Sequence, residues 1–199
     1  MISLRVSVLL LALCTACGAA TPAPATPAPA AGSSAPMWIV DPAHSTLGFS
    51  GTQAGASFKG AFRRFSVKLA FDPANPASGR IEVGIDTTSV DTQDAERDTT
   101  IKSSDFFDIA HHPQAGYLTE AITAMGTGFT GSGKLSLRGV SRAVPIEFTF
   151  TRTAAGAMLN GHATLKRLDF GVGQGEWQST EWVGNEVKVE FALVLKPAT

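Results

Sequence analysis

Apolar and polar residues alternate along five segments of the chain. The segments are 65–71, 81–85, 134–138, 144–150 and 187–195. In a β-strand successive side chains point to opposite faces, so each segment would have one apolar face and one face in contact with water. The pattern therefore predicts strands that enclose a common apolar interior.

Weaker segments extend this pattern to eight or nine strands. They lie at 38–40, 46–50, 115–124 and 158–170. Short turns, such as Asp-Pro-Ala-Asn-Pro at 72–76, separate the segments, and short turns join antiparallel neighbours. So many antiparallel strands in one domain predict a sandwich or a closed barrel. A barrel of about eight strands either fills with its own side chains or admits one small ligand.

The stretch near residues 92–108 does not alternate and predicts a short helical insertion. A turn at 89–92 leads into a helix over 95–103, and 104–108 is expected to form a second short helical turn. Phe106 and Phe107 are too apolar for a loop surrounded by water. We expect them to plug one end of the barrel or to line its mouth.

Two tryptophans, Trp177 and Trp182, lie in a glycine-rich loop between the last two strands. Three interpretations are open at this point. The tryptophans grip a ligand at the mouth of the barrel, they contact a membrane or a partner, or they fold over the open end of the barrel.

The first 36 residues precede the predicted domain at 37–199. Arg5, an apolar run at 6–13 and small residues after it are typical of an export signal at 1–16, and the run is too short to span a bilayer. Cys17 would then be the lipid anchor of a lipoprotein, and cleavage after Ala20 is the alternative. The Ala/Pro-rich segment 17–36 predicts a linker.

Charge and cysteine content narrow the possible functions. The net charge of the chain is −1, and it becomes −2 when Arg5 leaves with the signal. A nearly neutral chain without a basic stripe is a poor match for nucleic acid. Cys14 and Cys17 both precede the domain, so the domain has no internal disulfide and depends on its core for stability.

Three groups of residues resemble nucleotide- or metal-binding motifs. Residues 126–131 match G-x-G-x-x-G, but a strand follows instead of a helix, so we expect a turn or a bulge. The acids at 91–98 lack the register of a calcium loop and are expected near the start of the helix, with Asp98 beside an arginine. His111 and His112 would point to opposite faces of a strand, which predicts a solvent-exposed pair and no metal site.

Asp41, His44 and Ser45 are the residue types of a hydrolase triad. Such close neighbours in an extended segment cannot converge on one reacting atom. We expect His44 to satisfy backbone groups at the end of the barrel. The sequence therefore assigns no catalytic residue.

Several motifs, in this order and at these spacings, resemble the YceI family of bacterial periplasmic proteins from Ile39 to about Lys196. They include Asp-Pro-Ala-His-Ser at 41–45, Phe-Lys-Gly-Ala-Phe at 58–62, Ser-Val-Asp-Thr at 89–92, Ser-Asp-Phe-Phe-Asp at 104–108, Gly-Lys-Leu-Ser-Leu-Arg-Gly-Val at 133–140 and Arg-Leu-Asp-Phe-Gly-Val at 167–172. Residues 173–177 resemble a branch of the family that is also found beside membrane cytochrome domains.

The resemblance implies an all-β, antiparallel, eight-stranded lipocalin-like barrel with a long apolar pocket in a periplasmic protein. It implies binding of isoprenoid chains, including those of quinones, or of other long amphiphiles, and it allows a homodimer. Family members often carry a histidine where this chain reads Gly-Thr-Gln-Ala-Gly at 51–55, so no role of that histidine is carried over. The family implies no shared catalytic residues.

We therefore expect a binding or carrier protein, not an enzyme, that sequesters an isoprenoid, quinone-like or other long-chain amphiphile and needs no other cofactor. One alternative is an accessory protein of membrane electron transfer that presents quinone to a cytochrome. Another is an enzyme acting on lipid, with His44 or Glu176 as its general base. The candidate residues lining the pocket are Phe49, Phe58, Phe62, Phe65, Ile85, Phe106, Phe107, Phe129, Trp177 and Trp182.

Overall fold

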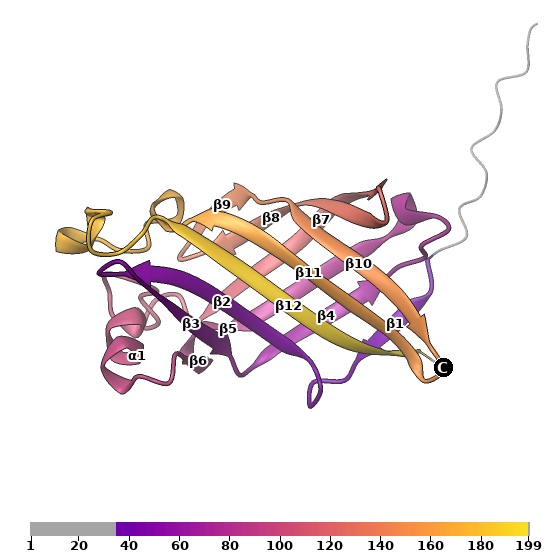
Figure 1. Cartoon of the computed structure of the whole chain (residues 1–199), viewed down its shortest axis with the longest axis horizontal. Helices are drawn as coiled ribbons and strands as arrows, with labels where there is room; N and C mark the ends of the chain where they lie inside the picture. Colours follow the sequence, from indigo (N-terminus) through magenta and orange to yellow (C-terminus); the bar gives the residue numbers. More distant parts are fainter. Residues whose placement is uncertain (1–34, 199) are drawn as a thin grey trace, which may run out of the picture. The chain divides into compact units, whose positions relative to one another are not determined.

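A computed structural model describes residues 35–198, which form an antiparallel β barrel (Figure 1). One sheet holds the twelve strands of this region: β1 Met37–Val40, β2 Thr46–Gln53, β3 Ala56–Phe62, β4 Phe65–Ala70, β5 Arg80–Asp86, β6 Val90–Asp91, β7 Gln114–Met125, β8 Gly128–Leu137, β9 Val140–Ala143, β10 Ile146–Thr153, β11 Gly156–Lys166 and β12 Glu186–Pro197. The helices are α1 Ala95–Lys102 and four short 3-10 turns, η1 Pro76–Ser78, η2 Thr87–Ser89, η3 Arg167–Phe170 and η4 Gly175–Gln178.

Eight of these strands close the barrel. They pair in the order β1-β4-β5-β7-β8-β10-β11-β12, and β12 pairs back onto β1, with Trp38 opposite Pro197. All of these pairings are antiparallel, as the short connections predict. The eight-stranded antiparallel barrel with one short helical insertion is therefore confirmed.

Three further strands, β2, β3 and β6, extend the wall at one end. Strand β12 pairs with β2 over Lys188–Ala192 and with β1 over Leu195–Pro197, so β1 and β2 follow one another along the same edge of β12. Strand β3 pairs with β2, and β6 pairs with β3. The prediction of eight or nine strands missed β3, β6 and β9. Neither β3 nor β9 has a clear alternation of large apolar and polar residues, and β6 is only two residues long, within the predicted turn at 89–92.

Residues 41–45 form the bend between β1 and β2. The Ser45 hydroxyl donates to the Asp41 carbonyl at 2.6 Å and accepts from the Val194 N–H at 3.0 Å. The Asp41 carboxylate accepts from Lys196 Nζ at 2.9 Å and lies 3.3 Å from His44 Nδ1. His44 is exposed and bonded to a carboxylate, so the expectation that it satisfies backbone groups was wrong. The group is a structural corner of the wall.

Helix α1 begins where the cluster of acids predicted a helix start. The Asp94 carboxylate accepts from the N–H groups of Glu96 and Arg97, which caps the helix. Asp98 accepts from the N–H and the hydroxyl of Thr92, so the expected arginine partner is wrong. Residues 104–107 form a hydrogen-bonded turn and not a second helical turn: the Phe106 N–H donates to the Ser103 carbonyl and the Phe107 N–H to the Ile101 carbonyl.

The two remaining motifs have structural roles. The glycines at 126–131 lie at the β7–β8 hairpin, where Met125 pairs with Gly128 and Gly126 has a φ of +57°, which confirms the predicted turn. His111 is exposed and its Nδ1 lies 2.9 Å from Asp108 Oδ1, whereas His112 is half-buried beside Gly139. The expectation of a fully solvated pair was therefore wrong for His112. The predicted signal at 1–16, Cys17 and the linker up to residue 34 lie outside the described residues.

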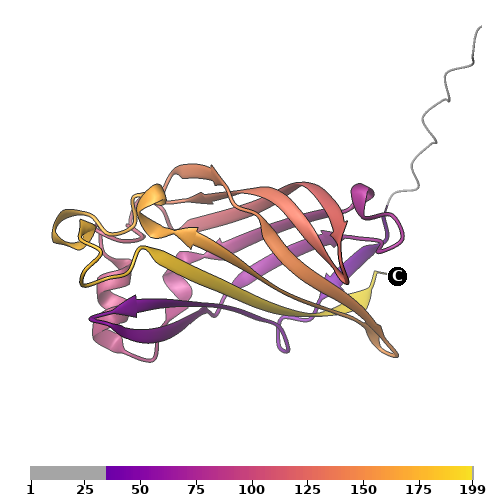
Figure 2. The same ribbon diagram turned by 45° about the horizontal axis from the view of Figure 1, so that its top comes forward.

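The barrel has two unlike ends. Figure 2 shows α1 and the loop between β11 and β12 at one end, and the end of the described chain at the other. At the second end, here called the packed end, five rings fill the interior: Trp38, Phe71, Phe129, Phe148 and Phe150. Phe71 lies at their centre, with ring centroids 4.9–5.4 Å from three of the others, and its carbonyl accepts from the Trp38 Nε1–H. The end with α1 is called the mouth end below.

Candidate ligand cavity

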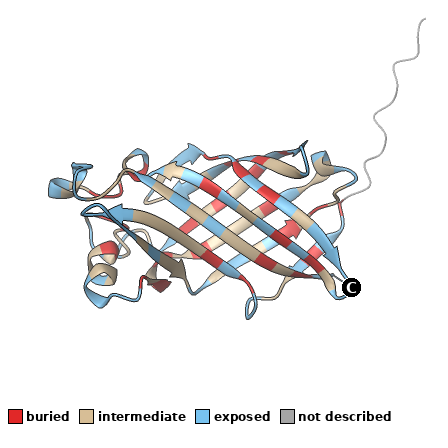
Figure 3. Ribbon diagram, in the orientation of Figure 1, coloured by how far each residue is buried: buried red, intermediate tan, exposed pale blue. Residues whose placement is uncertain are grey.

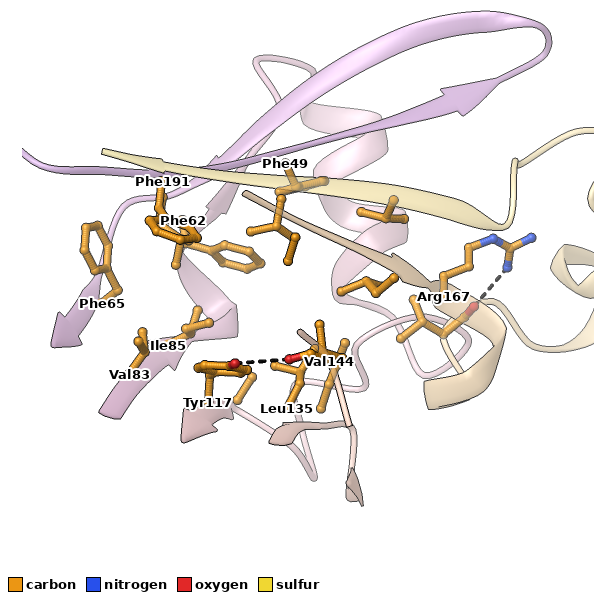
Figure 4. Close-up of a pocket in the computed structure, with 18 of the residues that line it drawn as sticks. Phe49, Phe62, Phe65, Val83, Ile85, Tyr117, Leu135, Val144, Arg167 and Phe191 are labelled. Atoms are coloured by element: carbon orange, nitrogen blue, oxygen red, sulfur yellow. Dashed lines mark hydrogen bonds between the residues drawn. The ribbon is translucent and has the colours of Figure 1, made fainter. Parts of the chain in front are cut away.

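An apolar cavity of about 200 Å³ lies inside the barrel toward the mouth end. Its wall comes from inward-facing side chains of β2, β3, β4, β5, β7, β8, β10, β11 and β12, and α1 and the turn after it add Ile101, Phe106 and Phe107. Figure 4 shows the aromatic and aliphatic side chains that converge on this space. The alternation read from the sequence is the reason that most of these strands present an apolar side chain here.

The interior rows of single strands show where packing ends and the cavity begins. On β4, Leu69 is 0 % exposed, whereas Val67 and Phe65 on the same face are half-buried. On β12, Leu195 and Leu193 are buried, whereas Phe191 and Val189 are half-buried. In Figure 3 the half of β12 nearer the mouth end accordingly has no buried residue, and buried residues recur toward the packed end. Interior side chains near the mouth therefore have apolar surface without a protein partner.

Three lining residues carry polar side-chain groups, Thr52, Tyr117 and Arg167, and backbone carbonyls satisfy the groups of Tyr117 and Arg167. The Tyr117 hydroxyl lies 3.0 Å from the Val144 carbonyl oxygen and 3.3 Å from that of Gly131, and it can donate to either one. Burial raises the pKa of Tyr117 to about 12, so the phenol is neutral at physiological pH. A satisfied neutral hydroxyl adds little polarity to the cavity.

Arg167 is a charged residue of the lining and is only 3 % exposed. Its guanidinium donates to five backbone carbonyls, those of Val172, Trp177, Ser179, Val183 and Gly184, at 2.7–3.3 Å. Burial lowers the pKa of Arg167 from its ordinary value. Figure 4 shows its guanidinium directed toward the loop, with a bond to a backbone carbonyl, and away from the labelled aromatic side chains.

The loop at 167–185 is thus wound around one buried cation. Gly173, with a φ of +93°, has no room for a side chain, because a Cβ there would overlap the Arg167 guanidinium. The N–H groups of Gly173 and Gln174 donate to the Asp105 carbonyl at 2.8 Å, which ties this loop to the turn after α1. Trp177 packs on Phe106 with 5.6 Å between ring centroids, and Phe107 packs on Phe62 at 5.9 Å. Together these segments cover the mouth end.

Most of the candidate residues read from the sequence lie on this cavity. Phe49, Phe58, Phe62, Phe65, Ile85, Phe106 and Phe107 all line it. Whether they contact a bound molecule stays a prediction. Trp177 lies over the turn that carries Phe106, and Trp182 is 67 % exposed at the rim of the mouth end. Cys17 lies outside the described residues.

Phe129 does not line the cavity. Its ring lies 4.9 Å from Phe71 and 5.5 Å from Phe148, within the packed end. The sequence placed it wrongly because the alternation shows which face of β8 is inward and not how far along the barrel a residue sits.

Several lining residues were missed as site residues. Val83, Leu135 and Val189 were predicted to face inward but were not assigned to the pocket. Their signal was present in the alternation of β5, β8 and β12. Arg167 was not assigned at all, since a single arginine next to a glycine-rich loop has no distinctive pattern.

Neither candidate general base is placed for chemistry in the cavity. His44 belongs to the exposed corner between β1 and β2, and Glu176 is exposed in η4. Within residues 35–198 no group of three metal-ligating side chains comes together, and no helix of that region is long and apolar enough to cross a membrane. The arrangement can bind an apolar molecule and exclude water from it.

A closed antiparallel barrel with an apolar cavity at one end defines a lipocalin-like class of fold. The model of the YceI-like domain matches residues 38–195, and the chain belongs to this family. A UPF0312 protein of Azotobacter vinelandii is 32 % identical over 155 residues, which cover 74 % of this chain and 81 % of that protein. A UPF0312 protein of Vibrio campbellii is 37 % identical over 123 residues, 60 % of this chain, and the match spans only 65 % of that relative's length.

Solved structures agree with the fold. BcnA of Burkholderia cenocepacia has a TM-score of 0.75 and 34 % identity, and the match covers 80 % of this chain and 99 % of that one. A polyisoprenoid binding domain from Saccharophagus degradans has a TM-score of 0.59 at 16 % identity, with 81 % and 98 % covered, which shows a shared fold alone.

Proposed function

We propose that this protein is a periplasmic binding or carrier protein that sequesters the apolar tail of an isoprenoid, quinone-like or other long-chain amphiphile. The observation that carries the proposal is the cavity, which is lined mostly by apolar side chains and in which backbone carbonyls satisfy the Tyr117 hydroxyl and the Arg167 guanidinium. Such a space offers a guest burial of hydrocarbon and few polar contacts. The YceI family and the polyisoprenoid-binding neighbour support this choice of ligand.

The driving force is the transfer of hydrocarbon out of water, about 0.8 kcal/mol per CH₂ group. The entropy lost by a flexible tail offsets much of this gain, so discrimination among tails should be loose. The cavity of about 200 Å³ is below the ~300–1,000 Å³ typical of ligand pockets. A long tail would therefore need the half-buried rings that border the cavity, such as Phe62 and Phe65, to move aside.

Periplasmic expression followed by native mass spectrometry and lipid extraction tests the proposal. We expect lipid to co-purify with the protein, and added prenyl chains to bind the delipidated protein. Val83→Trp should abolish binding because it places an indole in the cavity, whereas Glu82→Gln, the neighbouring residue on the outward face of β5, should bind normally. The proposal fails if the native protein neither carries nor binds a tail, or if Val83→Trp binds as well as the native protein.

We also propose that Cys17 anchors the mature protein to a membrane. The support is the sequence alone, in which a cysteine follows an apolar run and small residues. Fractionation of cells that express the native protein and Cys17→Ala is the test. Membrane association that persists in Cys17→Ala would count against the anchor and leave the carrier proposal unaffected.

A second function is an accessory role in membrane electron transfer, in which the protein presents quinone to a cytochrome. The observation that favours it is Trp182, which is 67 % exposed at the mouth end and is available to a partner. Quinone reduction by membranes should then accelerate on adding the native protein and less on adding Trp182→Ser. Equal rates of quinone reduction with and without the protein would contradict the accessory role and leave sequestration as the function. An enzyme acting on lipid has the least support, because His44 and Glu176 lie outside the cavity lining.

A further inference from the structure

A second, polar hollow of about 230 Å³ adjoins the apolar cavity at the mouth end. It lies between the tip of the β2–β3 hairpin, α1 and the loop at 167–185, and it is called the vestibule here. Four apolar residues, Phe58, Ile101, Phe106 and Val183, line both spaces. An elongated molecule that passed between these four side chains would have one end in an apolar space and the other in a polar one.

The one arginine of the vestibule is already engaged. Arg97 Nε donates to Gln53 Oε1 at 3.0 Å, and Nη2 lies 3.2 Å from Asp94 Oδ2. The guanidinium also lies 4.8 Å above the ring of Phe58, which is one of the shared residues. Since Gln53 Oε1 accepts from Arg97, the Gln53 side-chain nitrogen is left as a donor toward a ligand oxygen.

Negative charge exceeds positive charge around the vestibule. Asp94 and Glu96 both line it, against the single cation Arg97. The backbone N–H of Arg97 donates to the Asp94 carboxylate and is the main cause of its lowered pKa, so Asp94 is ionised at neutral pH. A second carboxylate on a headgroup, or a phosphate, would meet like charge here.

The buried guanidinium of Arg167 cannot offset this excess of negative charge. Arg167 lines the apolar cavity, but its guanidinium is occupied by five backbone carbonyls. Within residues 35–198, Arg97 and Arg167 are the basic residues that line either space. A phosphate-bearing head would thus have to displace existing partners, and a cationic head would lie beside Arg97.

We propose that the vestibule receives the head of the bound amphiphile and selects an uncharged, oxygen-bearing head over a phosphate. The inference rests on the proposed carrier function and specifies the class of ligand. An uncharged carbonyl or hydroxyl accepts hydrogen bonds from donors such as Gln53 without entering the field of the two carboxylates. A quinone or a prenyl alcohol fits this description, and a prenyl phosphate does not.

Three probes with the same four-isoprene tail separate head from tail: geranylgeraniol, geranylgeranyl phosphate and a naphthoquinone bearing that tail. Dissociation constants for the delipidated native protein are measured at low and at high salt. We expect the two uncharged probes to bind about ten-fold more tightly than the phosphate at low salt, and the gap to narrow as salt screens the carboxylates.

Charge-removing variants assign the selectivity to the vestibule. Glu96→Gln combined with Asp94→Asn should tighten phosphate binding several-fold relative to binding of the alcohol, and Asn keeps an oxygen to cap α1. Glu147→Gln, an exposed position on β10 outside both linings, is the matched control and should change neither.

The outcomes separate the two proposals. Equal or tighter binding of the phosphate by the native protein would overturn the headgroup assignment while tail binding still supports a carrier. Selectivity that survives the double variant unchanged would also overturn it, because the discrimination would then arise elsewhere. If none of the three probes binds, the carrier proposal and the vestibule both fail.

Discussion

The packed end and the mouth end of this barrel share most of their strands and have the same kinds of inward residue, yet only the mouth end is hollow. At the packed end, Phe71 is 0 % exposed and lies against three other rings. At the mouth end, the inward residues Phe65 and Val67 border a cavity of about 200 Å³. Alternation decides which face is inside, whereas the volumes of the side chains that meet there decide whether the inside is solid.

The largest expected effect comes from truncating one phenylalanine at each end, which compares how tightly the two ends are packed. Phe71→Ala should lower the free energy of unfolding by about 3–5 kcal/mol, because it opens a void among closely packed rings. Phe65→Ala should lower it by about half as much or less, since its ring is already partly unpacked. Urea denaturation of both variants measures the contrast. Equal losses would mean that the mouth end is as tightly packed as the other end.

Removal of the Arg167 guanidinium tests whether this side chain holds the loop at 167–185 over the mouth end. Arg167→Met should lower the free energy of unfolding by about 2–3 kcal/mol, because it leaves buried carbonyls without donors. Amide hydrogen exchange should rise at 172–184, whereas exchange in the strands of the packed end should remain slow. The control is Arg142→Met, whose exposed guanidinium makes one long contact of 3.4 Å. Unchanged exchange at 172–184 would show that the loop is held by other contacts.

Enlarging adjacent inward residues of β4 gives the most direct comparison. Leu69→Phe should destabilise the protein by about 1–3 kcal/mol, because the packed end has no space for extra atoms. Val67→Phe, two positions away on the same face, should be nearly neutral for stability and should weaken tail binding. Thermal unfolding and tail titration on both variants test this. A stability loss for Val67→Phe that matches the loss for Leu69→Phe would contradict the comparison.

The smallest expected effect concerns pH at the corner between β1 and β2. A hydrogen bond from Lys196 is the main cause that lowers the pKa of Asp41 from 3.8 to about 2. The ionised form is favoured in the folded state, so this contribution to stability is present above pH 4 and is lost as the pH falls toward 2. The melting temperatures of the native protein and Lys196→Met should therefore converge on acidification. A gap that does not shrink would argue against this ion pair.

Much of the barrel was predictable from local pattern. The alternation in β4, β5 and β12 reflects one buried and one wet face, which is a local property of a half-buried strand. Strand β3 was missed because Ala56, Ser57 and Gly60 give it no regular alternation, and its strand conformation depends on pairing with β2. The division of β12 between β1 and β2 was equally hidden, since it arises from pairing over long separations in sequence.

The residues that line the cavity were harder to predict from the sequence than the strands that form the barrel. Phe129 and Phe65 are indistinguishable as inward phenylalanines, and only their positions along the barrel put one in the packed end and one at the cavity. The burial of Arg167 could not be predicted from the sequence, for a different reason. Its environment consists of backbone carbonyls, which every residue possesses, so the sequence leaves no trace of the partners that allow a cation to be buried there.

The described chain both enters and leaves the barrel at the packed end, where Trp38 pairs with Pro197 and the Ala198 N–H donates to the Met37 carbonyl. A tag, a fluorophore or a surface tether joined to either end of the described chain would therefore attach at the packed end, away from the mouth end. The domain could then be immobilised by its packed end, with the mouth end facing the solution.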